Sequence, residues 1–262
     1  MASIPGSHYD IFAPGQAVNI AATYNPPTIA PPVAGEFNLE VIINGTGTGN
    51  YAPAAGYQGV AIESMPGKTI PATLTLLHGD FGLVDAGGNN LIKLGDGSES
   101  VGGASGDTLV GGTGLNQFID AHLGNQSVLG GSGGTETIWG GLGDTITGGT
   151  GGNETIGGVA GDTIVGNGGN EFIAGDRGNQ SIVGGNSGNE TIWGGLGDTI
   201  RGGSGGNETI AGVSGETIVG GAANTFFDAT SGNESIVAGT ATRRSGAARM
   251  TPCKAPRAAA RR

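Results

Sequence analysis

Residues 136–156 read ETIWGGLGDTITGGTGGNETI, and residues 190–210 repeat them as ETIWGGLGDTIRGGSGGNETI with two differences. A shorter period runs through both copies, since every eighteenth position is an isoleucine, at Ile146, Ile164, Ile182, Ile200, Ile218 and Ile236. A second series interleaves with the first at the same mean spacing, at Ile138, Ile156, Ile173, Ile192, Ile210 and Phe227. Each of these residues stands in a short strand-like triplet, and glycine-rich turns separate the triplets. Self-similarity at a short fixed period is typical of a solenoid, in which stacked repeats build a continuous core.

The triplets predict an all-β fold, a parallel β-roll or β-solenoid of about nine coils, with about 18 residues and two short strands per coil. Their Ile, Thr and Val residues favour strands, whereas Gly and Asn in the turns supply the positive φ that tight turns need. Between residues 83 and 239 no stretch has the 3.6-residue stripe of a helix. With 58 glycines in 262 residues the composition alone would indicate disorder, but the glycines fall on the turns in register.

The chain divides into four segments. Residues 1–35 contain two Pro-Pro pairs and are expected to form an extended arm or linker. Residues 36–82 hold less regular strand-like runs and are expected to cap the open end of the solenoid. Residues 83–239 form the roll, and residues 240–262 form a basic tail without an apolar period, which we expect to be disordered.

Charge separates the body from the tail. All 22 acidic residues precede residue 241, with only four basic residues, whereas the tail holds seven basic residues and the single cysteine, Cys253. The acidic body predicts no nucleic-acid partner, and nucleic-acid or membrane binding remains an alternative only for the tail. No apolar run is long enough for a transmembrane helix, so no membrane span is predicted.

Carboxylates recur at fixed places in the turns. Two residues before each inward apolar residue, one side of the solenoid carries Asp107, Gln126, Asp144, Asp162, Gln180, Asp198, Glu216 and Glu234. The other side carries Glu99, Gln117, Glu136, Glu154, Glu171, Glu190 and Glu208. Stacked carboxylates about 4.8 Å apart repel by about 1 kcal/mol even in water. Either Ca²⁺ binds between adjacent turns and offsets the repulsion, or the side chains splay into solvent.

The chain resembles the hemolysin-type (RTX) calcium-binding repeat family, whose nonapeptide is GGxGxDxUx with U an inward aliphatic residue. GGLGDTI at residues 140–146 and 194–200 carries the resemblance, which covers about residues 83–239. The even nonapeptide spacing of the family is replaced here by alternating short and long steps, as from Ile138 to Ile146 and from Ile146 to Ile156. The resemblance implies a parallel β-roll that binds Ca²⁺ through its turn aspartates, which in this chain are Asp107, Asp144, Asp162 and Asp198.

A metal-independent solenoid is the alternative. Asparagines three residues before the inward residue form one column, at Asn116, Asn153, Asn170, Asn189, Asn207 and Asn224, and stacked Asn side chains can hydrogen-bond from coil to coil. Outward Thr and Ser residues form a second column, which leaves an ice-binding surface as a further possibility. Such a solenoid would serve as a spacer or as a surface binder.

Aromatic residues follow a longer period of three coils, the distance from Trp139 to Trp193. In triplets with an inward isoleucine, the flanking residues point outward. The sequence therefore predicts an exposed stripe that could bind a glycan or a cell-surface protein, although tandem duplication alone would also explain it. The stripe consists of Phe118, Trp139, Phe172, Trp193 and Phe226.

No catalytic site is predicted. The GxSxG matches at residues 130–134 and 202–206 lie in repeat turns rather than at a strand-to-helix elbow. The three histidines are scattered, with no HExxH motif. We expect a calcium-binding structural or adhesive module, located outside the cell or at its surface and exported without an N-terminal signal peptide.

Overall fold

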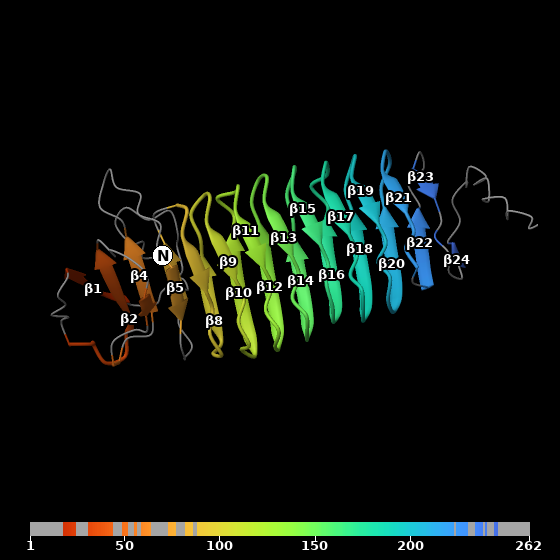
Figure 1. Ribbon diagram of the computed structural model, residues 1–262. Coiled ribbons are helices and arrows are strands. Elements are labelled where there is room, and N and C mark those ends of the chain that lie inside the picture. The colour runs from red at the N-terminus through yellow and green to blue at the C-terminus, as the bar shows by residue number, and fades with distance from the viewer. Residues whose placement is uncertain are drawn as a thin grey trace, which may run out of the picture.

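The structure is a computed structural model that describes residues 18–24, 31–43, 49–51, 55–56, 59–63, 73–76, 82–85, 88–222, 224–229, 234–237, 239 and 244–245. These residues form a long stack of short strands without a helix among them (Figure 1). The strands pair in parallel and lie in two sheets that run the length of the stack. Ile146 pairs with Ile164, the next member of its series, so each repeat forms one turn. The predicted parallel β-solenoid is therefore confirmed.

Among the described residues, one sheet contains 13 strands, and each coil contributes one of them. In spatial order these are β1 (Val18–Tyr24), β2 (Phe37–Ile43), β4 (Gly59–Glu63), β6 (Gly82–Asp85), β8 (Glu99–Gly102), β10 (Asn116–Ala121), β12 (Thr135–Gly140), β14 (Asn153–Gly157), β16 (Asn170–Gly175), β18 (Asn189–Gly194), β20 (Asn207–Gly212), β22 (Asn224–Ala229) and β24 (Arg244–Ser245).

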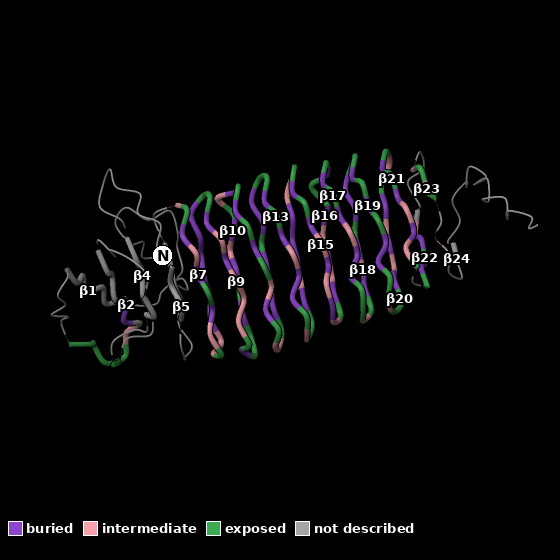
Figure 2. The backbone as a smooth tube through the Cα atoms, viewed as in Figure 1, coloured by how far each residue is buried: buried purple, intermediate pink, exposed green. Residues whose placement is uncertain are grey.

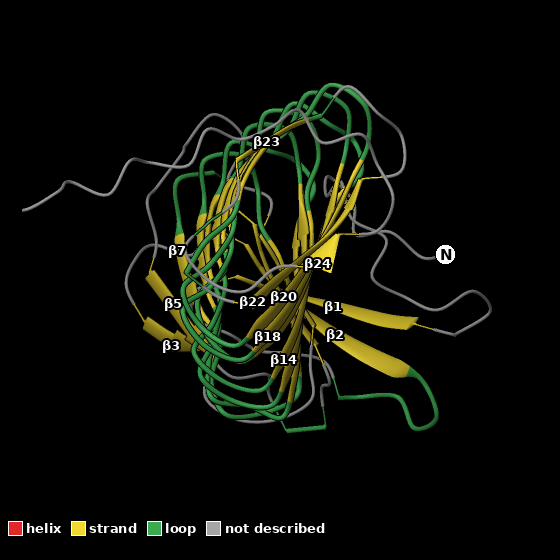
Figure 3. Cartoon of the chain, turned by 90° about the vertical axis from the view of Figure 1, so that its right-hand side faces the viewer, coloured by secondary structure: helices red, strands yellow, loops and turns green. Residues whose placement is uncertain are grey.

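In the part of the chain that the structure describes, the opposite sheet contains 11 strands, most of them short triplets. They are β3 (Gly49–Tyr51), β5 (Thr73–Leu76), β7 (Leu91–Lys93), β9 (Thr108–Val110), β11 (Ser127–Leu129), β13 (Thr145–Thr147), β15 (Thr163–Val165), β17 (Ser181–Val183), β19 (Thr199–Arg201), β21 (Thr217–Val219) and β23 (Ser235–Val237). Viewed along the axis, the two sheets form opposite walls that turns join at both ends (Figure 3).

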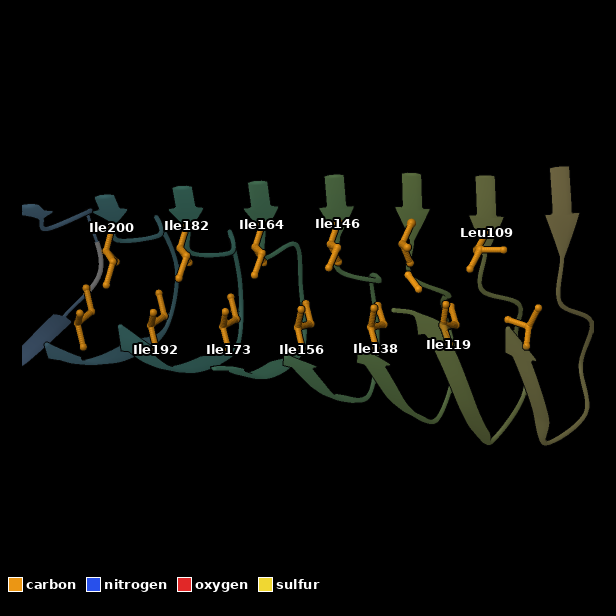
Figure 4. Packing of buried hydrophobic residues seen from close by; sticks show 14 of the residues in the cluster. Leu109, Ile119, Ile138, Ile146, Ile156, Ile164, Ile173, Ile182, Ile192 and Ile200 are labelled. Atoms are coloured by element: carbon orange, nitrogen blue, oxygen red, sulfur yellow. The ribbon is translucent and has the colours of Figure 1, made fainter. Parts of the chain in front are cut away.

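The core is the row of isoleucines that the period predicts. Ile138 pairs with Ile156 in the 13-stranded sheet, and Ile146 pairs with Ile164 in the other. The two rows face each other across the interior (Figure 4), and all four side chains are fully buried. Burial alternates along each strand, so buried positions follow one another from coil to coil (Figure 2). Each buried isoleucine stabilises the stack by about 2 kcal/mol.

The turns need glycine where coils approach closely. Gly152 has a φ of 77°, and a Cβ added there would lie 1.5 Å from the carbonyl oxygen of Gly134 in the preceding coil. Both the left-handed backbone and the close approach therefore exclude other residues at this position. Glycines in register are a condition for stacking, which explains why a glycine-rich chain is ordered here.

The N-terminal segments contribute strands to the two sheets. Residues 18–24, expected in an extended arm, form β1, which pairs with β2 over its whole length. The strands between residues 37 and 76 belong to the same two sheets and stack on the regular coils, in the segment that the sequence predicts as an irregular β cap. The coils of this segment are longer than the later ones, since Val41 pairs with Ala61, and Ala61 pairs with Val84.

At the other end, the first part of the basic tail also continues the sheet. Arg244 of β24 pairs with Phe226 of β22, at the same sequence spacing that separates Ile146 from Ile164. The strand β24 therefore keeps the period of the solenoid at residues 244–245, within the segment predicted as a tail. The remainder of the predicted tail, with Cys253, lies outside the described residues.

Candidate functional site

The outward surface of the 13-stranded sheet carries the predicted aromatic stripe. Trp139 and Trp193 are 48% and 53% exposed, Phe118 and Phe226 are 37% and 39% exposed, and Phe172 is half-buried. They stand on β12, β18, β10, β22 and β16, each next to a buried residue of the core. Alternation along a strand puts all five rings on the same outer surface. We name this surface the aromatic face.

The tryptophan rings lie against small residues of adjacent coils. Trp139 pairs with Gly157, and a Cβ added to Gly157 would lie 2.5 Å from two carbons of the Trp139 ring. Trp193 pairs with Ala174 on one side and with Ala211 on the other. Small neighbours let each ring lie close to the sheet, so the indoles are held in place and still exposed.

Threonines fill the remaining places in the column of phenylalanines. From β10 to β22 this column alternates one Phe with two Thr, in the order Phe118, Thr137, Thr155, Phe172, Thr191, Thr209 and Phe226. The aromatic face therefore combines flat apolar rings with hydroxyl groups. Trp139 and Trp193 stand three coils apart, or about 14 Å at the spacing of neighbouring strands.

The four aspartates predicted as calcium ligands are buried in the interior, where each closes a turn. The Oδ2 atom of Asp144 accepts a hydrogen bond from the N–H of Gly141 at 2.7 Å, within the same turn. Its Oδ1 atom accepts one from the N–H of Gln126, in the preceding coil, at 2.8 Å. Each carboxylate therefore joins two coils. Asp107, Asp162 and Asp198 make the same pair of contacts.

These contacts do not fit a calcium shell. Ca²⁺ is held by six to eight oxygens, and carboxylate oxygens supply the charge. Around Asp162 the turn instead directs N–H groups, from Val159 and from Asp144, at both carboxylate oxygens. Within the part of the chain that the structure describes, no group of three or more His, Cys, Asp or Glu side chains is placed to hold a metal. Calcium binding at these aspartates stays a prediction.

Of the four aspartates, the structure brings only Asp144 and Asp162 into neighbouring coils. Gln126 stands between Asp107 and Asp144, and Gln180 stands between Asp162 and Asp198. Both glutamines are about 3% exposed, and their side-chain amides have no hydrogen-bond partner. The aspartates are therefore separate turn closures rather than one cluster.

The interior position of the carboxylates raises their pKa values. Burial raises the pKa of Asp107 and of Asp144 to about 6, against the effect of the N–H groups that they accept from. Burial also raises the pKa values of Asp162 and Asp198. Glu216, which takes the same place one coil after Asp198, has a pKa of about 8, raised by burial and then by Asp198 and Glu234.

A second interior column, at the other end of each coil, consists of glutamates. We name Glu136, Glu154, Glu171, Glu190 and Glu208 the Glu column; they occupy consecutive coils in register and are 2% to 4% exposed. The expectation that these side chains splay into solvent is wrong. A residue two positions before an inward isoleucine lies on the same side of the strand as that isoleucine. This alternation is the sequence feature that could have predicted the buried position of the glutamates.

Asparagines on the outside form the ladder that a metal-independent solenoid predicts. Asn170 donates from Nδ2 to the Oδ1 atom of Asn153 at 3.1 Å, and Asn189 donates to Asn170 at 3.2 Å. Asn207 donates to Asn189 at 3.1 Å, and Asn224 donates to Asn207 at 3.5 Å. These side-chain bonds join five successive coils without a metal.

The opposite sheet has a different outer surface. Val165, Val183 and Val219 lie there in one column with Arg201, beside paired glycines of the turns. Because the glycines have no side chains, a shallow groove of about 590 Å³ runs along the column. This surface carries no aromatic ring among the described residues of β15, β17, β19 and β21, and it provides an internal control for the aromatic face.

The formal catalytic motifs fall where the repeats predict. Gly130–Gly134 lies in the turn between β11 and β12, and Gly202–Gly206 lies between β19 and β20. His122 lies 2.9 Å from the carboxylate of Asp120 on an exposed edge. No helix able to span a membrane occurs in the described ranges.

No protein-family model matches the chain, and no curated protein or solved structure matches it either. The resemblance to hemolysin-type repeats therefore rests on the GGLGDTI motif and on the shape of the solenoid.

Proposed function

We propose that the chain is a stiff, metal-independent β-solenoid rod, a structural or adhesive module whose aromatic face binds a glycan. The observation that carries the proposal is the placement of Trp139 and Trp193, which are half exposed and stand in the same column three coils apart. Exposed rings of this size are unusual on a surface without a partner.

The regular spacing favours a polymer that runs along the rod. A polysaccharide presents the same sugar at fixed intervals, so equivalent rings at equivalent places on the rod can engage equivalent units. The indole rings supply apolar area for the flat side of a sugar. Thr155, on a strand between the two tryptophans, and Thr191, on the strand of Trp193, supply hydroxyl groups that bond to sugar hydroxyls. A protein partner is the alternative occupant of the same face.

Binding to immobilised polysaccharides tests the proposal. The chain with Trp139→Thr and Trp193→Thr should keep its circular dichroism spectrum and lose at least tenfold in affinity for the polysaccharide that the wild type binds. A matched control changes Leu129→Thr and Val237→Thr, two residues of the opposite sheet that are each 45% exposed. Equal binding by both variants and the wild type would contradict a role for the aromatic face.

Metal independence is supported by the contacts of the turns. The buried aspartates have N–H partners for both oxygens, and the asparagine ladder joins the coils outside. Calcium binding at Asp107, Asp144, Asp162 and Asp198 is the competing function, which the resemblance implies and the excess of acidic residues favours. Thermal unfolding with and without calcium separates the two.

An extracellular or cell-surface location belongs to this proposal, since a glycan-binding rod meets its partner there. Fractionation of the source cells tests the location, with the intact chain expected in the medium or on the outer surface. No catalytic role is proposed.

A further inference from the structure

The Glu column places five carboxyl groups in the interior of the stack. Successive members pair directly, as Glu136 with Glu154, Glu154 with Glu171, and Glu190 with Glu208. Neighbouring strands lie about 4.8 Å apart, so the carboxyl groups are stacked at that spacing. Five full negative charges in a row cannot be buried without positive charge or protons to compensate them.

Turn N–H groups satisfy only part of the column. Glu136 accepts from Gly131 at 2.8 Å, and Glu154 accepts from Gly149 at 2.5 Å. Glu171 accepts from Asn167 at 2.6 Å, and Glu208 accepts from Gly203 at 2.6 Å. In each case a single carboxylate oxygen accepts the N–H. The column therefore keeps oxygen atoms that the backbone does not reach.

Several of these oxygens are buried without a hydrogen-bond partner. They are Oε1 of Glu136, Oε2 of Glu154, Oε2 of Glu171 and both oxygens of Glu190. A Cβ added to Gly185 would lie 2.7 Å from Oε2 of Glu171 and 2.6 Å from Oε1 of Glu190. The two side chains therefore converge at this glycine. A buried polar atom without a partner keeps the full cost of its lost hydration, so the folded state needs something that satisfies these oxygens.

The described residues that are seen to meet the Glu column from the turns and at its two ends are neutral. The turns that meet it from the opposite sheet present paired glycines, as at Gly148 and Gly149 or Gly184 and Gly185. The neutral side chains of Gln117 and Thr225 stand in the coils beyond its two ends. Thr225 donates its hydroxyl to Oε2 of Glu208 at 2.9 Å. Protons on the glutamates themselves are the simplest source of compensation.

We propose that Glu154 and Glu190 are protonated in the folded rod at neutral pH, and that each carboxyl donates its proton to a carboxylate stacked on it. Glu154 and Glu190 are the second and fourth of the five stacked members, so two protons there leave no two adjacent carboxylates charged. Charged and neutral carboxyl groups then alternate along most of the column. The repulsion between nearest neighbours disappears, and hydrogen bonds between coils replace it.

Burial raises pKa values along the column, including those of Glu136 and Glu171. Burial raises the pKa of Glu154 to about 8, and the charges of Glu136 and Glu171 act in the same sense. Burial, with the charges of Glu208 and Glu171, raises the pKa of Glu190 to about 8. Because the ordinary value is 4.5, folding takes up protons between these limits. The stability that these two groups contribute is therefore fully present below pH 4.5 and is lost as the pH rises through 8.

The rod is thus a proton-linked assembly. Folding should take up about two protons at pH 7 on account of this column. A rod of this kind is strongest in acid surroundings and loosens in alkaline ones, which is the reverse of a protein held by salt bridges of ordinary carboxylates.

The test compares the pH dependence of stability in two matched double variants. Glu154→Gln with Glu190→Gln replaces each protonated carboxyl by a neutral amide that also donates a hydrogen bond. We expect stability close to wild type at pH 6, a higher denaturation midpoint than wild type at pH 9, and a flatter profile between them. Asp176→Asn with Asp228→Asn removes two charges from outside the column and should leave the wild-type slope unchanged.

Infrared spectra of the wild type keep the test independent of whether the variants fold. A band of protonated carboxyl groups should be present at pH 7 and vanish when the folded chain is brought to pH 9 and beyond. The inference is overturned if no such band exists at pH 7, or if the glutamine variant keeps the wild-type slope. It is also overturned if chelator abolishes the stability at pH 7 and Ca²⁺ restores it, because a metal ion would then balance the column.

Discussion

Phe172 on β16 and Trp193 on β18 meet edge to face, with ring centroids 5.0 Å apart and ring planes at 82°. The contact is diagonal, since Trp193 pairs with Ala174, two residues beyond Phe172. Two rings from adjacent coils thus form one rigid unit on the aromatic face. Its position in the middle of the stack makes it the place where the packing of the stripe can be measured.

A double-mutant cycle measures that packing. The coupling free energy between Phe172→Thr and Trp193→Thr should be about 1 kcal/mol, because an edge-to-face pair contributes that much beyond its buried area. Urea unfolding of the four chains gives the value. The same cycle for Phe226→Thr with Trp139→Thr should give a coupling near zero, since their strands β22 and β12 are far apart in the sheet. Equal coupling in both cycles would show that the measured effect is not the ring contact.

The inward register makes a prediction for the core. Ile164 is fully buried between Ile146 and Ile182, whereas Val165 beside it points outward. Ile164→Asp should destabilise the fold by about 4 kcal/mol or more, because it buries a charge without a partner. Val165→Asp should cost less than about 1 kcal/mol. Chemical denaturation distinguishes the two, and a similar loss in both would contradict the register.

The buried aspartates that close the turns predict a loss of stability when one carboxylate is replaced by an amide. Asp162→Asn keeps the shape of the side chain but replaces one carboxylate oxygen by an NH2 group. That NH2 group then faces one of the two backbone N–H groups, of Asp144 or of Val159, that donate to the carboxylate. We expect a loss of about 1 to 3 kcal/mol, the cost of a buried donor without a partner. Asp176→Asn, on an exposed turn, is the control and should change the stability by less than about 0.5 kcal/mol. A stabilised Asp162→Asn chain would refute the closure.

The asparagine ladder should contribute a smaller, measurable amount. Asn189 donates to Asn170 and accepts from Asn207, so Asn189→Ala breaks two bonds at once. The expected loss is about 1 kcal/mol, because exposed hydrogen bonds contribute little each. Asn224, at the end of the ladder with one bond of 3.5 Å, should lose less when changed to Ala. Melting temperatures of the two variants give the comparison, and no loss in either would show that the ladder does not stabilise the stack.

The fold follows from the sequence because the inward residue is nearly always isoleucine and the period rarely slips. The outward placement of Trp139 follows from the same alternation. The strand β1 was harder to predict, since the Pro-Pro pairs that follow it dominate the composition of that segment. The first coils are also longer, since Val41 pairs with Ala61. Because their strands do not recur at the period of the later repeats, that period does not predict that the sheets continue through them.

The interior acids show why periodicity alone does not give the chemistry. Alternation places Asp144 and Glu154 on the same side as the isoleucines, yet carboxylates are rarely buried, so solvent or metal is the natural expectation. What decides their environment is the conformation of the turn, which directs N–H groups of Gly141 and Gly149 at them. That direction depends on backbone angles that composition does not specify.

We propose that backbone N–H groups and protons, rather than metal ions, balance the buried carboxylates. The most direct measurement is thermal unfolding at pH 7, followed by circular dichroism, in chelator and in millimolar Ca²⁺. We expect a fully folded chain in chelator and melting temperatures that agree within about 2 °C, because a ligand that does not bind cannot shift the equilibrium. A chain that is unfolded in chelator, or whose melting temperature climbs with calcium concentration, would contradict this claim.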